Sequence, residues 1–473
     1  MDRRTGDVAH RFLVHPRLGG YAGSAMKKFS RRSFLAQSVL GAALTYAPWS
    51  GARSVRSRDG DSSTFVVTLE LKGGADVTQF CDPKINVEGH PKINHWADQS
   101  RPGRSGNLHY APVADNEWLF TRFGADMLII NGVDVQTNSH DTGLLFNFTG
   151  SNSEGQPSLG ALHAACFGPD LPLAYSVFGG TTRTSGLITY NRFRGIEQVS
   201  ELARPNWDSV AQDALRPELE LSAIANFQQN RMAHLANYDH NTPRQRLSLQ
   251  NLSNAIGNRA RLLDLVDLIP DRNQLEQPSD IDVQGVDLSN DLRRQIQSAL
   301  IIAQSGLGCA ADLVLDGFDS HEANDAVQQT LFSILADGLG YFWDLAGELG
   351  VDDRILLVIG TDFGRTNHYN DADGKDHWNV GSYVLMEKNA RWGNRVVGLT
   401  DPLHFARRVD RKTLQDSAQG VLITPAHIHK ALRHYLGLDQ FAMDQGLDLS
   451  NVELLPIFDS SVQTVAARRS RLT

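Results

Sequence analysis

Residues 354–380 read RILLVIGTDFGRTNHYNDADGKDHWNV. The apolar run at 355–359, closed by Gly360, is typical of a strand buried on both faces of a parallel sheet. We expect this strand to end at Asp362, and open α/β sheets bind ligands beyond the carboxyl ends of their strands. The polar stretch that follows predicts a metal or oxyanion site, or else a solvated loop. Its candidate residues are Arg365, His368, Asp376 and His377.

Composition limits the class of protein. Of the 473 residues, 41% are hydrophobic and 21% are charged, which suits a soluble globular chain with a large core. The net charge of −9 does not favour binding to a polyanion, so we expect no nucleic-acid partner. Three scattered cysteines are too few for a disulfide framework or a cysteine-rich metal site.

The N-terminus carries a targeting pattern. Residues 30–35 read SRRSFL and precede a moderately apolar stretch that is too short to span a bilayer. This resembles a bacterial twin-arginine (Tat) signal, with a basic amphipathic helix as the alternative. We assign the signal to residues 26–53 and interpret residues 1–25 as an extension from a misassigned start. The resemblance implies passage through the Tat translocase to the periplasm or beyond, with no membrane span in the mature chain.

Three further buried strands are expected, each followed by polar residues. Residues 65–71 precede Gly73, Gly74 and Asp76, and Asp76 is either a metal ligand or a helix cap. Residues 311–316 precede Asp319 and His321. A helix leads from there to the 355–359 strand in a right-handed βαβ unit, so both strands deliver their polar residues to one edge. This convergence favours a metal site.

The third of these strands, residues 125–131, leads to Thr137, Ser139 and His140. A hydroxyl beside metal ligands is suited to nucleophilic attack, because the metal lowers its pKa. Capping of the next helix by Ser139 is the alternative reading. We expect one α/β domain over residues 62–460, with a helical insertion at about 206–268 and a C-terminal tail at 461–473.

Taken together, these motifs resemble the bacterial domain-of-unknown-function family 1501, which looks like a member of the alkaline phosphatase superfamily with the sulfatases. The resemblance covers most of residues 62–440. It implies an alkaline phosphatase-like α/β fold with a mostly parallel sheet, helices on both faces, and one or two metals at the strand ends. Zinc is the expected ion, with calcium, magnesium or manganese as alternatives. The motifs are Gly73–Asp76, Ser139 with His140, residues 317–321, and residues 362–366 ahead of Asp376 and His377.

Roles follow from the resemblance by position. Asp319, His321 and His377 look like the ligands of one metal, and Asp76 and Asp362 like carboxylates of another. Ser139 occupies the nucleophile region, with Thr137 as the neighbouring candidate, and Arg365 is expected to hold substrate oxygens in bidentate fashion.

The match is incomplete. The sulfatase Cys-x-Pro-x-Arg motif is absent, and Phe363 stands where phosphatases place a histidine, so His140 or His368 is needed as a substitute. The resemblance implies an exported metal-dependent hydrolase of a small phosphate or sulfate ester. The alternative is a non-catalytic periplasmic binding or assembly protein that keeps the fold with a structural or vestigial metal site.

Overall fold

The computed structural model describes residues 64–462, except for 180, 209–212 and 238–240. By its internal contacts the chain divides into residues 1–56 and 57–473, and all described residues belong to the second unit. The predicted Tat signal and upstream extension therefore lie outside the described residues, as does most of the predicted tail. In the described part of the chain, no helix has the length and hydropathy needed to cross a membrane.

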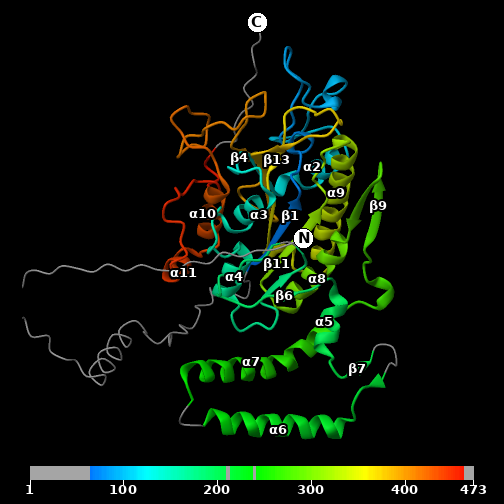
Figure 1. Ribbon diagram of the computed structural model, residues 1–473, viewed down its shortest axis with the longest axis vertical. Helices are drawn as coiled ribbons and strands as arrows, with labels where there is room; N and C mark the ends of the chain where they lie inside the picture. Colours follow the sequence, from blue (N-terminus) through cyan, green and yellow to red (C-terminus); the bar gives the residue numbers. More distant parts are fainter. Residues whose placement is uncertain (1–63, 180, 209–212, 238–240, 463–473) are drawn as a thin grey trace, which may run out of the picture. The chain divides into compact units, whose positions relative to one another are not determined.

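One eight-stranded sheet forms the centre of this unit (Figure 1). Strand β15 runs antiparallel to both its neighbours, and the other paired strands run parallel. The strands, in order across the sheet, are β16 (Arg395–Val397), β4 (Met127–Asp134), β15 (Val380–Met386), β12 (Ile355–Thr361), β1 (Phe65–Lys72), β11 (Ala310–Asp316), β5 (Tyr175–Val177) and β6 (Asn191–Arg192).

Helices cover both faces of the sheet because its central strands are apolar on both sides. In β12, Leu357 and Ile359 belong to one core cluster, whereas Leu356 and Val358 belong to another. The first cluster includes residues of α2 (Asn116–Phe123), α5 (Ile196–Ala203), α7 (Pro243–Val266), α8 (Leu292–Ser305) and α9 (Asn324–Glu348). The second includes residues of α4 (Leu159–Phe167), α10 (Pro425–Tyr435) and α11 (Asp439–Asp444). The predicted α/β class, a mostly parallel sheet between two helical layers, is confirmed.

The crossover from β11 to β12 decides where the functional loops lie. Helix α9 connects these two strands, and β1 lies between them in the sheet. Lys72 at the end of β1 is paired with Asp316, and Leu71 with Thr361, so the three strands end at one level. The loops that follow β1, β11 and β12 therefore leave the same edge of the sheet, as the sequence predicts.

Smaller elements complete the unit. Helix α3 (His140–Thr149) follows β4 and packs on β12. The predicted helical insertion contains a two-stranded hairpin, then α6 (Glu218–Ala236), in which no residue is buried, and α7. The remaining strands form four pairs: β2 (Gly103–Ser105) with β3 (Leu108–Tyr110), β7 (Trp207–Asp208) with β8 (Asp213–Ala214), β9 (Ser279–Val283) with β10 (Val286–Asn290), and β13 (Gly364–Arg365) with β14 (His377–Trp378).

Candidate metal centre

Three imidazole rings meet one carboxylate at the edge where β1, β11 and β12 end. The Nε2 atoms of His321 and His377 lie 3.1 Å and 3.2 Å from Oδ1 of Asp319 and 3.0 Å from each other. Nε2 of His140 lies 3.4 Å from Oδ2 of the same carboxylate. His140, Asp319 and His377 also form a group whose ligand atoms all lie within 4.8 Å of one another.

Each imidazole uses its other nitrogen to contact an oxygen acceptor. Nδ1 of His140 lies 2.5 Å from Oδ2 of Asp362, and Nδ1 of His321 lies 2.9 Å from Oδ1 of Asp376. Nδ1 of His377 lies 2.8 Å from the backbone carbonyl of Asn138. A neutral imidazole that donates its proton from Nδ1 has a lone pair on Nε2.

This arrangement directs three nitrogen lone pairs toward one carboxylate, two of them to Oδ1 and one to Oδ2. Two neutral Nε2 lone pairs at 3.0 Å repel each other unless a cation lies between them. Histidine ligands of metals characteristically donate their second N–H to a carboxylate or carbonyl, which fixes the tautomer and the ring orientation. The donor set therefore fits a metal ion.

Several contacts among these residues have the spacing that a small ion needs. Zinc binds imidazole nitrogen and carboxylate oxygen at about 2.0–2.2 Å in tetrahedral geometry, so neighbouring donor atoms lie about 3.3 Å apart. Nε2 of His321 and Nε2 of His377 lie 3.1 Å and 3.2 Å from Oδ1 of Asp319 and 3.0 Å from each other, and Nε2 of His140 lies 3.4 Å from Oδ2. The group of donor atoms that all lie within 4.8 Å of one another contains His140, Asp319 and His377 but not His321. His140, Asp319 and His377 are therefore the candidate ligands, with His321 next to them.

The group is accessible from solvent. The side chains of His321 and Asp319 are 47% and 46% exposed, whereas Asp362 is fully buried. The hydrogen bond with Asp362 raises the pKa of His140 against the opposing effect of partial burial. Partial burial of Asp319 would raise its pKa, but the hydrogen bond and charge of Arg365 outweigh this effect and lower it.

The structure thus brings together three predicted ligands and revises the role of a fourth. Asp362 supports His140 from behind, since its other oxygen accepts the backbone N–H of Gly73 at 3.1 Å. His140, considered from sequence only as a substitute ligand, lies between Asp362 and Asp319. The exposed ring of His368 contacts the amide oxygen of its neighbour Asn367.

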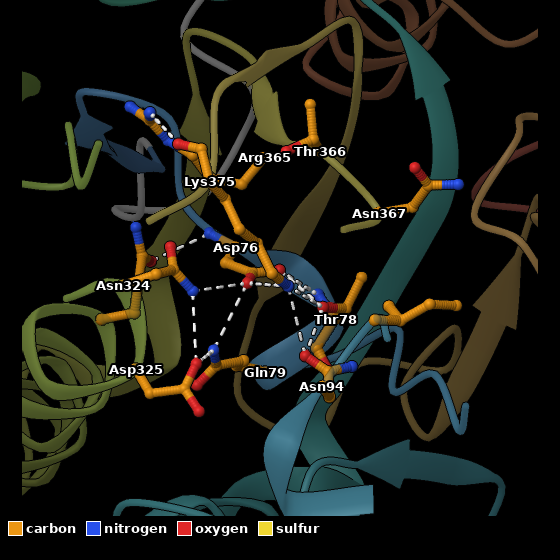
Figure 2. Close-up of polar contacts among 12 residues, drawn as sticks. Asp76, Thr78, Gln79, Asn94, Asn324, Asp325, Arg365, Thr366, Asn367 and Lys375 are labelled. Atoms are coloured by element: carbon orange, nitrogen blue, oxygen red, sulfur yellow. Dashed lines mark hydrogen bonds and ion pairs between the residues drawn. The ribbon is translucent and has the colours of Figure 1, made fainter. Parts of the chain in front are cut away.

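Asp76 lies in a separate buried cluster (Figure 2). Its carboxylate accepts hydrogen bonds from Lys375 Nζ at 2.7 Å and from the Thr78 hydroxyl at 2.6 Å. Asn324 Nδ2 donates to it at 3.0 Å. Because an ammonium group already neutralises this carboxylate, we withdraw Asp76 from the predicted metal ligands.

Arg365 is fully buried, which argues against the predicted substrate clamp. Its guanidinium donates to the carbonyls of Gly73, Gly74 and Lys375 and, at 2.5 Å, to Oδ1 of Asp319. These contacts use four of the five N–H groups that could hold substrate oxygens. Arg365 instead orients Asp319 toward the three histidines.

The hydroxyl candidates lie next to the cluster in the chain. Ser139 is exposed at the N-cap of α3, and its side chain makes no capping hydrogen bond there. It stands between Asn138, whose carbonyl contacts His377, and His140. Thr137 Oγ1 accepts the Ser139 backbone N–H at 3.1 Å. No side-chain hydrogen bond therefore supports helix capping by Ser139, and its role as the nucleophile stays a prediction.

Comparison with known proteins gives a family and distant structural likenesses. A family model described as "Protein of unknown function (DUF1501)" matches residues 64–450, and no curated protein matches the chain. Three solved structures illustrate the likenesses. A protein of the alkaline phosphatase superfamily from Vibrio parahaemolyticus is 7% identical, covering 80% of this chain and 67% of that one, with a TM-score of 0.35. The PsFucS1 sulfatase from Pseudoalteromonas is 9% identical (93% and 78% covered, TM-score 0.33). The alkaline phosphatase of the Antarctic bacterium TAB5 is 8% identical (71% and 95% covered, TM-score 0.27). These TM-scores are too low to support any statement about activity.

Proposed function

The chain belongs to the DUF1501 family, and from its site we propose that it is a metal-dependent hydrolase of small phosphate or sulfate esters, exported by the Tat route. One observation carries the proposal. Three histidines, each with Nδ1 held by an oxygen acceptor, direct Nε2 toward Asp319 in a solvent-accessible position. This donor set fits one divalent ion of the zinc type.

The protein's own residues prepare the site for that ion. His140, Asp319 and His377, with His321 next to them, would hold it, and when bound it supplies Lewis-acid polarisation of a phosphoryl or sulfuryl oxygen and lowers the pKa of a nearby hydroxyl or water. Arg365 holds Asp319 in its orientation. The acceptors on the three Nδ1 atoms keep the histidines in the tautomer that binds a metal.

We further propose Ser139 as the nucleophile, with Thr137 as the alternative. Ser139 is exposed and directly precedes the proposed ligand His140. Its position at a helix N-terminus places it near backbone N–H groups, which favour developing negative charge.

A second candidate function rests on a different observation. Arg365 and Lys375, the two cationic side chains of the 364–378 segment, are both fully buried and hydrogen-bonded within the protein. An anionic substrate therefore finds neither of them free to bind its oxygens. This favours the alternative of a periplasmic binding or assembly protein with a structural metal.

Elemental analysis joined to hydrolysis assays distinguishes the two functions. The protein, exported and purified natively, should contain about one zinc-like ion per chain, and His377→Ala should lose it. His434→Ala, which changes an exposed histidine paired with Asp439, is the matched control and should keep it. The hydrolase proposal also requires chelator-sensitive hydrolysis of an aryl phosphate or aryl sulfate. Bound metal with no turnover of either ester would leave the structural-metal alternative, and parent protein without metal would refute both the hydrolase and the structural metal.

A further inference from the structure

A buried ion pair lies behind the metal centre. Lys375 Nζ donates to Asp76 Oδ2 at 2.7 Å, and both side chains are 0% exposed. The ammonium also contacts Asn94 Oδ1 at 3.3 Å and Thr78 Oγ1 at 3.4 Å, so each of its three N–H groups has an acceptor (Figure 2). Burial opposes ionisation of Asp76, but the charge of Lys375 outweighs this and lowers the pKa of the carboxyl.

The backbone of Lys375 joins the two segments that supply metal ligands. Its N–H donates to the carbonyl of Ser320, the residue between Asp319 and His321, at 3.1 Å. Its own carbonyl accepts a hydrogen bond from Arg365 Nη1 at 2.9 Å. Next to it in sequence are Asp376, which contacts His321, and then His377.

The same segment is packed closely against His321. A Cβ atom added at Gly374 would lie 1.9 Å from the His321 carbonyl oxygen, so only glycine allows this approach. Asn370 Nδ2 donates to that carbonyl at 2.9 Å and to Asp376 Oδ1 at 3.2 Å. A displacement of Lys375 would therefore move proposed ligands on both sides of it.

We propose that Lys375 is a positioning residue, whose ion pair with Asp76 fixes residues 374–377 so that His321 and His377 face Asp319. The proposal rests on the proposed metal site. It also explains why the protein contains a buried ion pair at this position. A buried ion pair often adds nothing to stability over apolar residues of the same size. Here the ion pair serves to hold the local geometry, because it ties the loop that carries Asp376 and His377 to the turn after β1.

The test removes the pair without leaving a buried charge. Lys375→Met alone leaves Asp76 buried and unpaired, so the double variant Asp76→Asn/Lys375→Met is the decisive one. Arg395→Met is the control, since Arg395 is a buried cation on β16, where it donates to the Ile457 carbonyl. We would measure the Kd for Zn²⁺ by chelator competition, the thermal midpoint, and amide hydrogen exchange of the metal-free proteins.

The expected result is a local change. The double variant should fold with a cooperative transition, bind Zn²⁺ about 10–100-fold more weakly, as is typical when supporting residues of a metal site are lost, and exchange faster at residues 366–378 and 319–323. Arg395→Met should leave the Kd for Zn²⁺ and the hydrogen exchange of these residues at the parent values. Parent-like Kd and exchange in the double variant would overturn the proposal. If the parent itself binds no Zn²⁺, the proposed function fails, and exchange in the metal-free proteins still decides whether Lys375 positions the loop.

Discussion

Replacing Arg365 by methionine tests whether its guanidinium has a structural role or binds substrate oxygens. The substitution removes the donors to the buried carbonyls of Gly73 and Lys375, whereas Gly74 O keeps a second donor in Gln328 at 3.3 Å. An unsatisfied buried acceptor costs about 1–3 kcal/mol, so the two carbonyls together cost about 4 kcal/mol. For a domain of roughly 400 residues this lowers the thermal midpoint by about 5 °C.

Thermal unfolding of the metal-free protein measures this loss directly. Arg407→Met is the matched control, because Arg407 is 47% exposed in its ion pair with Asp416 and exposed pairs contribute at most about 1 kcal/mol. A substrate clamp makes the opposite prediction, a higher KM for an aryl ester with an unchanged midpoint. An Arg365→Met midpoint within about 1 °C of the parent would refute the structural role assigned here.

Two other predictions concern the nucleophile and acid stability. Ser139→Ala should abolish ester hydrolysis while metal content and the thermal midpoint stay at parent values, because the side chain makes no capping bond; hydrolysis at the parent rate would transfer the role to Thr137 or remove the covalent mechanism. Burial lowers the pKa of His404 to about 4 from the usual 6.5, so the unfolded chain binds the proton first and stability is lost as pH falls below 6.5. The resulting loss in the free energy of unfolding is about 2 kcal/mol by pH 5. His404→Asn, a residue that tolerates the positive φ of 62° there, should flatten the fall in thermal midpoint between pH 7 and 5, and an unchanged slope would contradict the assignment.

The position of this edge could be predicted because the three strands that form it have a recognisable sequence pattern. The apolar runs of β1, β11 and β12 require burial on both faces, and parallel strands must bring their carboxyl ends together. Asp319, His321 and His377 follow from this topology together with the family resemblance. The sheet order, by contrast, depends on long-range pairing, such as β15 running antiparallel between β12 and β4, for which a single sequence holds no local signal.

The division between ligands and their supports could not be predicted, since it depends on side-chain direction. Asp362 and Asp319 are both carboxylates beyond the ends of parallel strands, but Asp362 is fully buried and Asp319 is 46% exposed. Asp76 meets Lys375 across 299 positions of sequence, a distance at which spacing carries no information. One usable signal was His140, since it follows β4 on a polar segment as the other candidates follow their strands.

The charges of the site favour a divalent cation over a monovalent one. Counted as ionised, Asp319, Asp362 and Asp376 bring three negative charges, and Arg365 brings one positive charge. Lys375 does not enter this balance, because Asp76 neutralises it. With neutral histidines the centre carries a net charge of −2, and two protons or one divalent ion would balance it. Protons on both His321 and His377, whose Nε2 atoms lie 3.0 Å apart, would place two imidazolium ions in repulsive contact, whereas one divalent ion would balance the charge without that repulsion. Both cations of the loop are internal, and each holds one carboxylate in place: Arg365 holds Asp319, and Lys375 holds Asp76.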